Sequence, residues 1–273
     1  MKFHKKVSAD CKVRTREMPP RQSDRPARQS GVSLYEQFEL EKNPHPLKWT
    51  QLLQKKRFAR HHFEVVEGSV LTAEWAKQTG FRQPVISLKP QGLNMSMPSS
   101  TLSVRDVAES VGLDRKVNVI QVNTQEELMM TMGEWAAYFE QSPQVRKQIL
   151  NVISLEISSS PLGKSIVRPQ IVRDLDWIDN VWPVDLKPIE YPQVQCYCLM
   201  SVKNSYTDFH VDFGGTSVFY HVLSGEKIFY FVEPTKVNLK KYKNWSSSPD
   251  QSSRFLGDEV AECIEVVLRA GNT

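Results

Sequence analysis

A histidine and a carboxylate lie two residues apart in the segment YTDFHVDF, where they are His210 and Asp212. Side chains at positions i and i+2 of an extended strand point to the same face, so we expect these two groups to converge. Such a pair suits a divalent metal, and two histidines with one carboxylate are typical of non-haem Fe(II) sites. The same spacing also fits a solvated surface strand that carries one acid and one histidine.

The residues after this pair predict two more strands. Gly214 and Gly215 interrupt the first segment, and β-branched and aromatic side chains dominate residues 216–223 and 227–232. A Ser-Gly pair separates these two runs. We therefore expect a hairpin.

Lys227 is the only cation beside the second of these runs. A buried ammonium group requires an anionic partner. A small dicarboxylate would supply one, with the hydroxyl groups of Thr207 and Tyr220 as further donors. Alternatively, Lys227 lies at the mouth of the hairpin and points into water.

The rest of the chain must supply the elements that position these segments. Helices are expected at residues 47–57, 72–80 and 103–112, and further helices are expected to begin at Thr124, Thr131 and Thr235. Most of these predictions depend on residues that can cap a helix. Strands are expected at residues 84–89, 117–122, 149–157, 194–202 and 263–268. Residues 161–182 are expected to be helical or irregular. We expect Met129, Met130 and Met132 to fill the core, and Trp177 and Trp182 to pack against the sheets.

Composition indicates one globular core in 273 residues, with 40% hydrophobic and 24% charged residues. The net charge of +4 is uneven, because residues 1–28 carry nine Lys or Arg against three acids. Such a basic arm could bind nucleic acid or serve as a nuclear address, and it could also be a solvated tail. The four cysteines form no disulfide or zinc pattern, and Cys196 and Cys198 are expected as small apolar residues of one strand. No run of 18 apolar residues is present, so no membrane span is expected.

The run YTDFHVDFGGTSVFYHVLSGEKIFY strongly resembles the JmjC-domain histone lysine demethylases. The similarity is to two related groups, which carry either a PHD finger or an F-box with a CXXC zinc finger. The stretches LNMSMPSSTLSVRDV, NVISLEIS, DWIDNVWP and YCLMSV agree as well. DWIDNVWP is more similar to the F-box group and WSSS to the PHD group. The resemblance covers residues 84–273 and extends loosely back to residue 46.

The resemblance implies an α+β fold built on a double-stranded β-helix, the cupin-like jelly-roll barrel of JmjC domains, with N-terminal helices. The resemblance places the JmjC domain at residues 84–273. Residues 1–32 are rich in Arg, Pro, Ser and Gln and are expected to be a basic disordered arm, and residues 33–83 are expected to be a helical segment. By position, His210 and Asp212 match two iron ligands of the catalytic centre. The residues that match the 2-oxoglutarate pocket are Thr207, Lys227, Tyr220, Asn151 and Ile153.

The family's third iron ligand is a second histidine, placed soon after the segment that here ends at Thr273. We therefore expect the JmjC domain to be incomplete at its C-terminus, as in a fragment or a short product. His221 matches a family histidine that is not a ligand. Phe219 stands where the family has tryptophan, a change that keeps an aromatic ring.

The activity implied is Fe(II)- and 2-oxoglutarate-dependent demethylation of mono- or dimethyl-lysine on histone H3 tails, which releases succinate, CO₂ and formaldehyde. The implied setting is the nucleus, with the nucleosome as partner, possible DNA contact through the basic arm and no membrane. Two alternatives stay open. The chain could be an inactive JmjC module that acts as a chromatin scaffold, or a cupin-type protein hydroxylase.

Overall fold

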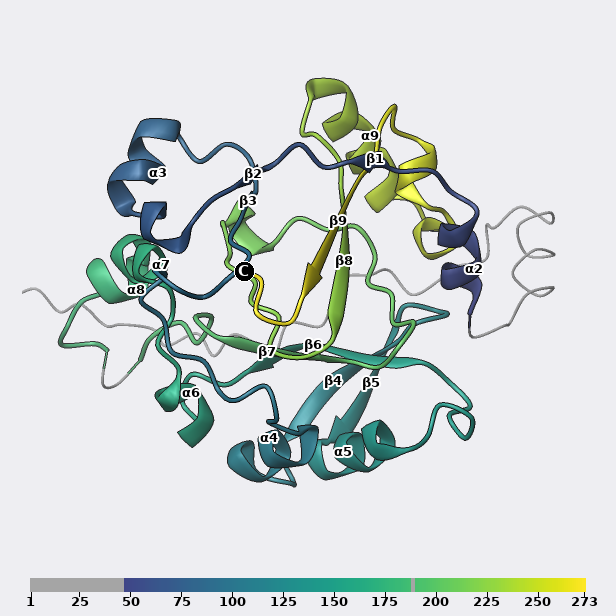
Figure 1. Ribbon diagram of the computed structural model, residues 1–273. Coiled ribbons are helices and arrows are strands. Elements are labelled where there is room, and N and C mark those ends of the chain that lie inside the picture. The colour runs from purple at the N-terminus through teal and green to yellow at the C-terminus, as the bar shows by residue number, and fades with distance from the viewer. Residues whose placement is uncertain (1–46, 188–189) are drawn as a thin grey trace, which may run out of the picture.

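The computed structural model describes residues 47–187 and 190–273 (Figure 1). The basic arm expected at residues 1–32, and the first part of the segment expected at 33–83, lie outside these residues. The described part is a mixed α+β structure with mainly antiparallel sheets. The predicted α+β class is therefore confirmed, whereas closure into a jelly-roll barrel stays a prediction.

Eight α-helices occur in the described residues. They are α2 (Lys48–Gln54), α3 (Ala73–Thr79), α4 (Val104–Val111), α5 (Met132–Glu140), α6 (Pro161–Ser165), α7 (Gln170–Leu175), α8 (Trp177–Asn180) and α9 (Lys236–Ser246). The strands are β1 (Ala59–Arg60), β2 (Glu64–Val65), β3 (Val85–Ile86), β4 (Lys116–Gln121), β5 (Glu126–Thr131), β6 (Leu150–Glu156), β7 (Tyr197–Ser201), β8 (Glu226–Phe231) and β9 (Ile264–Arg269).

The larger sheet has the strand order β5-β4-β6-β7, and all three of its pairings are antiparallel. Helices α4 and α5 run below it in Figure 1. They bury Ala108, Trp135 and Ala136 in one core with Val119 and Val152 of the sheet. This layer holds β6 and β7 in place, and the residues of the candidate site follow β7 directly.

The second sheet has the order β1-β9-β8, with β8 and β9 antiparallel and β1 parallel to β9. Ile264, Val266 and Leu268 alternate along β9 and are all buried. Phe229 and Phe231 of β8 pack on the same cluster. The β8–β9 ribbon thus has one apolar face, which packs against Phe63, Ile86 and Val222 from other segments.

Most predicted helix starts are confirmed. Thr72, Ser103, Thr131 and Thr235 each accept a backbone N–H in the first turn, as caps of α3, α4, α5 and α9. Ser103 and Thr131 also form the reciprocal capping box that their sequences indicate.

The helix predicted from Thr124 is wrong, because Glu126–Thr131 forms strand β5. Gln125 has a positive φ of 57° in the turn between β4 and β5, and its amide donates to the carbonyls of Val122 and Tyr206. These bonds stabilise a tight hairpin, and β5 then pairs with β4 along its whole length.

The strands predicted around the candidate metal pair and at residues 216–223 do not form. Phe213–Gly215 is a short 3₁₀ turn, and Gly214 and Gly215 both have a φ of +66°. Val222 bonds instead to the C-terminal turn at Gly271 and Asn272. Strand β8 therefore pairs with β9, and the predicted hairpin is absent.

Two packing expectations are wrong in part. Met132 is fully buried, but Met129 is 60% exposed because it lies on the edge strand β5. Trp177 at the start of α8 is 82% exposed, whereas Trp182 is half-buried.

Candidate metal centre

His210 and Asp212 lie side by side although they are not on a strand. The distance between His210 Nε2 and Asp212 Oδ1 is 3.8 Å. Asp212 has extended backbone angles, with φ −58° and ψ 151°. The short distance shows that the two side chains turn to one side, and both remain largely exposed, at 60% and 43%.

The tautomer of His210 is set by its own chain. Its Nδ1 lies 2.8 Å from the backbone carbonyl of Asp208. A carbonyl can only accept, so Nδ1 carries the proton, and in the neutral ring Nε2 keeps a free lone pair. Metal-binding histidines commonly donate their other N–H in this way. The free lone pair lies on the side of the Asp212 carboxylate.

Asp208 is a functional candidate that spacing alone did not reveal. Its carboxylate is buried and accepts bonds from the Tyr206 hydroxyl and the Phe209 N–H, both at 3.1 Å. Tyr206 in turn stacks on Trp49, with 4.3 Å between ring centroids. The carbonyl that orients His210 is therefore anchored in the core.

Asn151 and Thr207, far apart in the sequence, are in direct contact. The fully buried Asn151 amide donates to the Thr207 hydroxyl at 3.0 Å, and Ser201 donates to the other end of the amide at 2.6 Å. Because Thr207 accepts this bond, its own proton is left to donate elsewhere. Ile153 lies two residues beyond Asn151, half-buried in a bulge of β6.

Lys227 lies on the apolar face of β8, opposite Leu268 and in line with Phe229 and Phe231. Burial lowers the pKa of its ammonium group. Within residues 47–187 and 190–273, no carboxylate lies at ion-pair distance from it. Burying an ammonium group in this position costs free energy unless an anion pairs with it.

Tyr220 packs edge-on against Phe229, with ring centroids 4.9 Å apart. It thus joins the face of β8 that carries Lys227. Burial, and then the nearby Cys198 thiol of β7, raise the pKa of Tyr220 to about 12. The phenol therefore stays protonated at neutral pH and can act as a hydrogen-bond donor.

These residues form three local groups, which are the metal pair, the Asn151–Thr207 pair and the Lys227–Tyr220 face. Among the described residues, no hydrogen bond joins one group to another. In the same part of the chain, there is no group of three or more His, Cys, Asp or Glu side chains placed so that it could hold a metal ion.

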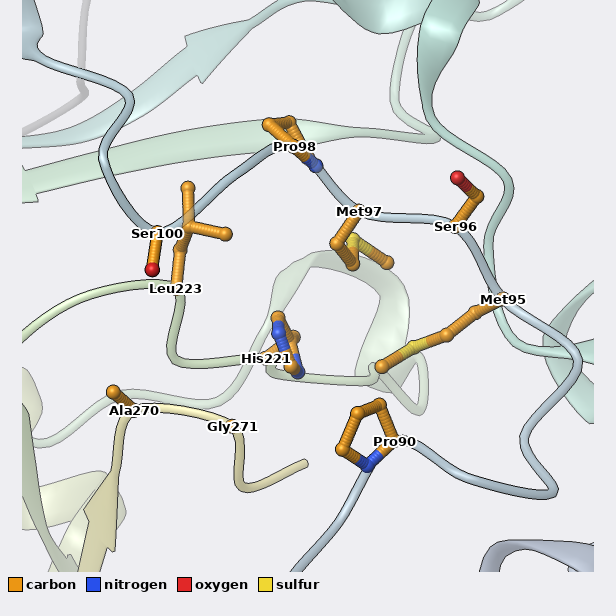
Figure 2. A pocket seen from close by; sticks show the side chains of 10 residues that line it. All are labelled: Pro90, Met95, Ser96, Met97, Pro98, Ser100, His221, Leu223, Ala270 and Gly271. Atoms are coloured by element: carbon orange, nitrogen blue, oxygen red, sulfur yellow. The ribbon is translucent and has the colours of Figure 1, made fainter.

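A separate cavity of about 540 Å³ lies between residues 90–100 and the C-terminal turn. Figure 2 shows His221 in its wall together with Pro90, Met95 and Met97. His221 Nδ1 lies 2.8 Å from the Thr273 hydroxyl. Neither residue of the metal pair lines this cavity.

Helix α9 packs directly on the segment that carries the metal pair. The backbone N–H of Val211 donates to the Tyr242 hydroxyl at 3.3 Å, and Trp245 contacts Phe209 edge-on. The sequence predicted this helix as a basic surface near the site, but not the contacts of Tyr242 and Trp245 with the segment that carries the metal pair.

Comparison with known proteins finds extensive similarity. The chain is 48% identical over 206 residues to Histone lysine demethylase PHF8 of Danio rerio, which covers 76% of this chain and 20% of that protein. It is 43% identical over 232 residues to Lysine-specific demethylase 2A of Xenopus tropicalis, covering 81% and 20%. JmjC domain-containing histone demethylation protein 1 of Aspergillus fumigatus is 51% identical over 194 residues, covering 70% and 14%.

The chain therefore spans about a fifth of the length of the first two of these relatives. No protein-family model matches it. Among the residues that the structure describes, no helix has the length and apolar character needed to cross a bilayer.

Proposed function

Because this chain is homologous to the JmjC-domain histone lysine demethylases over about three quarters of its length, we propose that it contributes the catalytic site of such an enzyme. The proposed reaction is oxidative removal of methyl groups from mono- or dimethyl-lysine on histone H3 tails. Fe(II) and 2-oxoglutarate are the proposed cofactor and co-substrate. The proposed setting is the nucleus.

His210 and Asp212 fit the metal. They provide an imidazole nitrogen and a carboxylate oxygen on one side of the chain, with the imidazole tautomer fixed by the Asp208 carbonyl. This donor set is two thirds of the facial triad of non-haem Fe(II) oxygenases. When bound, the metal supplies the oxygen chemistry, and the protein's task is to hold it and to leave positions open.

Lys227 fits the distal carboxylate of 2-oxoglutarate. Its ammonium lies on an apolar face, and none of the carboxylates in the described residues pairs with it, so a dicarboxylate would offset its burial. The Thr207 hydroxyl and the Tyr220 phenol are both able to donate to the same carboxylate. Asn151 orients Thr207, and Ile153 is proposed to line the pocket beside it.

The larger architecture proposed is the jelly-roll barrel, with the two main sheets as its opposing walls. The boundary between residues 83 and 84 stays a prediction. Residues 47–83 contribute β1 and β2 as well as helices, and these strands pair with β9 and β3 of the downstream region.

The observation that carries the proposal is the His210–Asp212 pair, with one imidazole nitrogen bonded to the chain and the other free. We therefore expect His210→Ala to weaken Mn(II) binding, used as a stable substitute for Fe(II), by at least about tenfold. Free Mn(II) would be measured by electron paramagnetic resonance. His62→Ala is the matched control, because His62 is exposed and belongs to none of the three groups.

The chemistry is tested with methylated H3 peptides, Fe(II) and 2-oxoglutarate, followed by mass spectrometry. We expect the peptide to lose a mass equal to one or two CH₂ units. His210→Ala should abolish this loss. A gain of one oxygen atom without loss of methyl would indicate a hydroxylase instead. Equal Mn(II) affinity of the His210→Ala and His62→Ala variants would refute the ligand assignment.

A further inference from the structure

Helix α9 carries a row of lysines that the proposed chemistry does not use. Its sequence, KVNLKKYKNWS, contains four lysines and no acid. Lys236, Lys240 and Lys243 follow the spacing i, i+4, i+7 and therefore lie on one face. All three are exposed. No ion pair involves them in the described part of the chain, whereas Lys241 bonds to the carbonyl of Glu259.

The opposite face of α9 is the one that packs on the protein. Trp245 is fully buried and donates to the Arg254 carbonyl, and Tyr242 contacts the backbone of Val211. On the helical wheel these two side chains point away from the lysine row. The row therefore faces outward from a helix that is fixed directly against the candidate metal pair.

The sign of this charge selects the partner. A histone tail is itself rich in lysine and arginine, so the row would repel it. Each strand of duplex DNA presents one phosphate per about 3.4 Å of helix axis, and the seven-residue span of the row rises about 10 Å along the axis of α9. Three lysines on such a span match about three phosphates of one strand.

We propose that Lys236, Lys240 and Lys243 bind the phosphate backbone of duplex DNA. In a nucleosome this contact would place the candidate site beside the DNA from which a histone tail emerges. The nucleosomal role rests on the proposed function, whereas binding to DNA does not. The bonds are to phosphates, so the contact is independent of base sequence.

The test compares two triple variants of the 273-residue chain with equal changes in charge. The variant of the row is Lys236→Gln, Lys240→Gln and Lys243→Gln. The control is Lys77→Gln, Lys89→Gln and Lys164→Gln, at exposed positions on other elements. Both keep the basic arm at residues 1–28. Affinity for a fluorescent DNA duplex is measured by polarisation at several salt concentrations.

We expect the row variant to lose about 2.7 units from the slope of log affinity against log salt, because each phosphate contact contributes about 0.9. Between 50 and 200 mM salt, the affinity of the parent should then fall about 40-fold further than that of the variant. The control should keep the parental slope. Circular dichroism of each variant verifies that α9 remains folded.

An equal loss in both variants would overturn the proposal, because the arm or the net charge would then explain binding. Tighter binding of the parent to poly-glutamate than to DNA would overturn it in favour of an acidic protein partner. Demethylation of free peptide should be the same in the row variant and the parent. If neither shows demethylation, the proposed activity fails, and the salt titration still decides on DNA binding.

Discussion

At the scale of single residues, two polar side chains near the candidate site differ in how their burial is compensated. Asn151 is fully buried, and both ends of its amide are hydrogen-bonded. Lys227 shares an apolar strand face with Phe229, and burial is the only cause that lowers the pKa of its ammonium group. An uncompensated cation lowers the stability of the fold, which is expected of a group kept for binding.

Lys227→Met should therefore stabilise the protein while it weakens 2-oxoglutarate binding. The unfolded chain holds the lysine proton up to its ordinary pKa, whereas the folded chain releases it at lower pH. The stability of the parent thus rises as pH increases between these two values. At pH 7 the variant should gain about 1 kcal/mol in the free energy of unfolding, measured in urea.

In the variant, the rise in stability at alkaline pH should disappear. Lys164→Met serves as the control, because Lys164 is exposed and its removal should change neither property. A loss of stability at pH 7 in Lys227→Met would show that its ammonium has a favourable partner in the folded chain.

At the scale of elements, two threonines show how tertiary contacts choose between similar local signals. Thr124 and Thr131 both begin segments with acidic residues at the expected capping positions. Thr131 caps α5 and accepts the N–H of Glu134 at 3.2 Å. Thr124 precedes a strand, because β5 pairs with β4 and the turn between them is held by Gln125.

Thr131→Ala should lower the free energy of unfolding by about 1 kcal/mol, because the Glu134 N–H in the first turn of α5 loses the threonine hydroxyl that accepts its bond. Thr124→Ala is the matched control and should cost much less, since its hydroxyl makes only a 3.4 Å contact with the N–H of Glu126. Chemical denaturation measures both. Equal costs for the two substitutions would contradict the assignment of the cap.

At the scale of the whole molecule, an ion network ties distant segments together. The Arg168 guanidinium contacts the carboxylates of Asp176 and Asp179, and Gln195 donates to both of them. Arg173 reaches across to the Asn94 carbonyl at 3.0 Å. The network thus joins the loop before α4, the helices α7 and α8 and the chain that leads into β7.

This network should contribute to the pH dependence of stability. Burial alone would raise the pKa of Asp176, but hydrogen bonds from Arg168 and Gln195 outweigh it and lower that pKa. The pKa of Asp179 is lowered as well, again against the effect of burial. Stability from these groups is present above the ordinary aspartate pKa of 3.8 and is lost as pH falls through the lowered values.

Arg168→Met should cost about 2 kcal/mol at pH 7, because it leaves the partly buried Asp176 without a cation and leaves Asp179 with Lys187 alone. It should also flatten the loss of stability below about pH 4. Arg105→Met is the control. It removes an exposed ion pair with Glu140 and should cost much less than Arg168→Met. Both are measured by urea unfolding across pH. An unchanged acid profile in Arg168→Met would contradict the role of the network.

The sequence by itself determined what depends on neighbouring residues. Capping bonds at Ser103 and Thr131 close within four residues, so their helices could be predicted. The proximity of His210 and Asp212 was predicted as well, although the strand from which it was argued does not form. Apolar runs located β6 and β9 to within about one residue at each end.

Only the tertiary structure decided which extended segments became strands, because a strand needs a partner for its backbone hydrogen bonds. Residues 216–223 had suitable side chains, but β8 pairs with β9 instead. The same holds for single groups whose partners are distant in the chain. Asn151 meets Thr207, and Asp208 is buried behind His210, only because the packed sheets and helices bring these segments together.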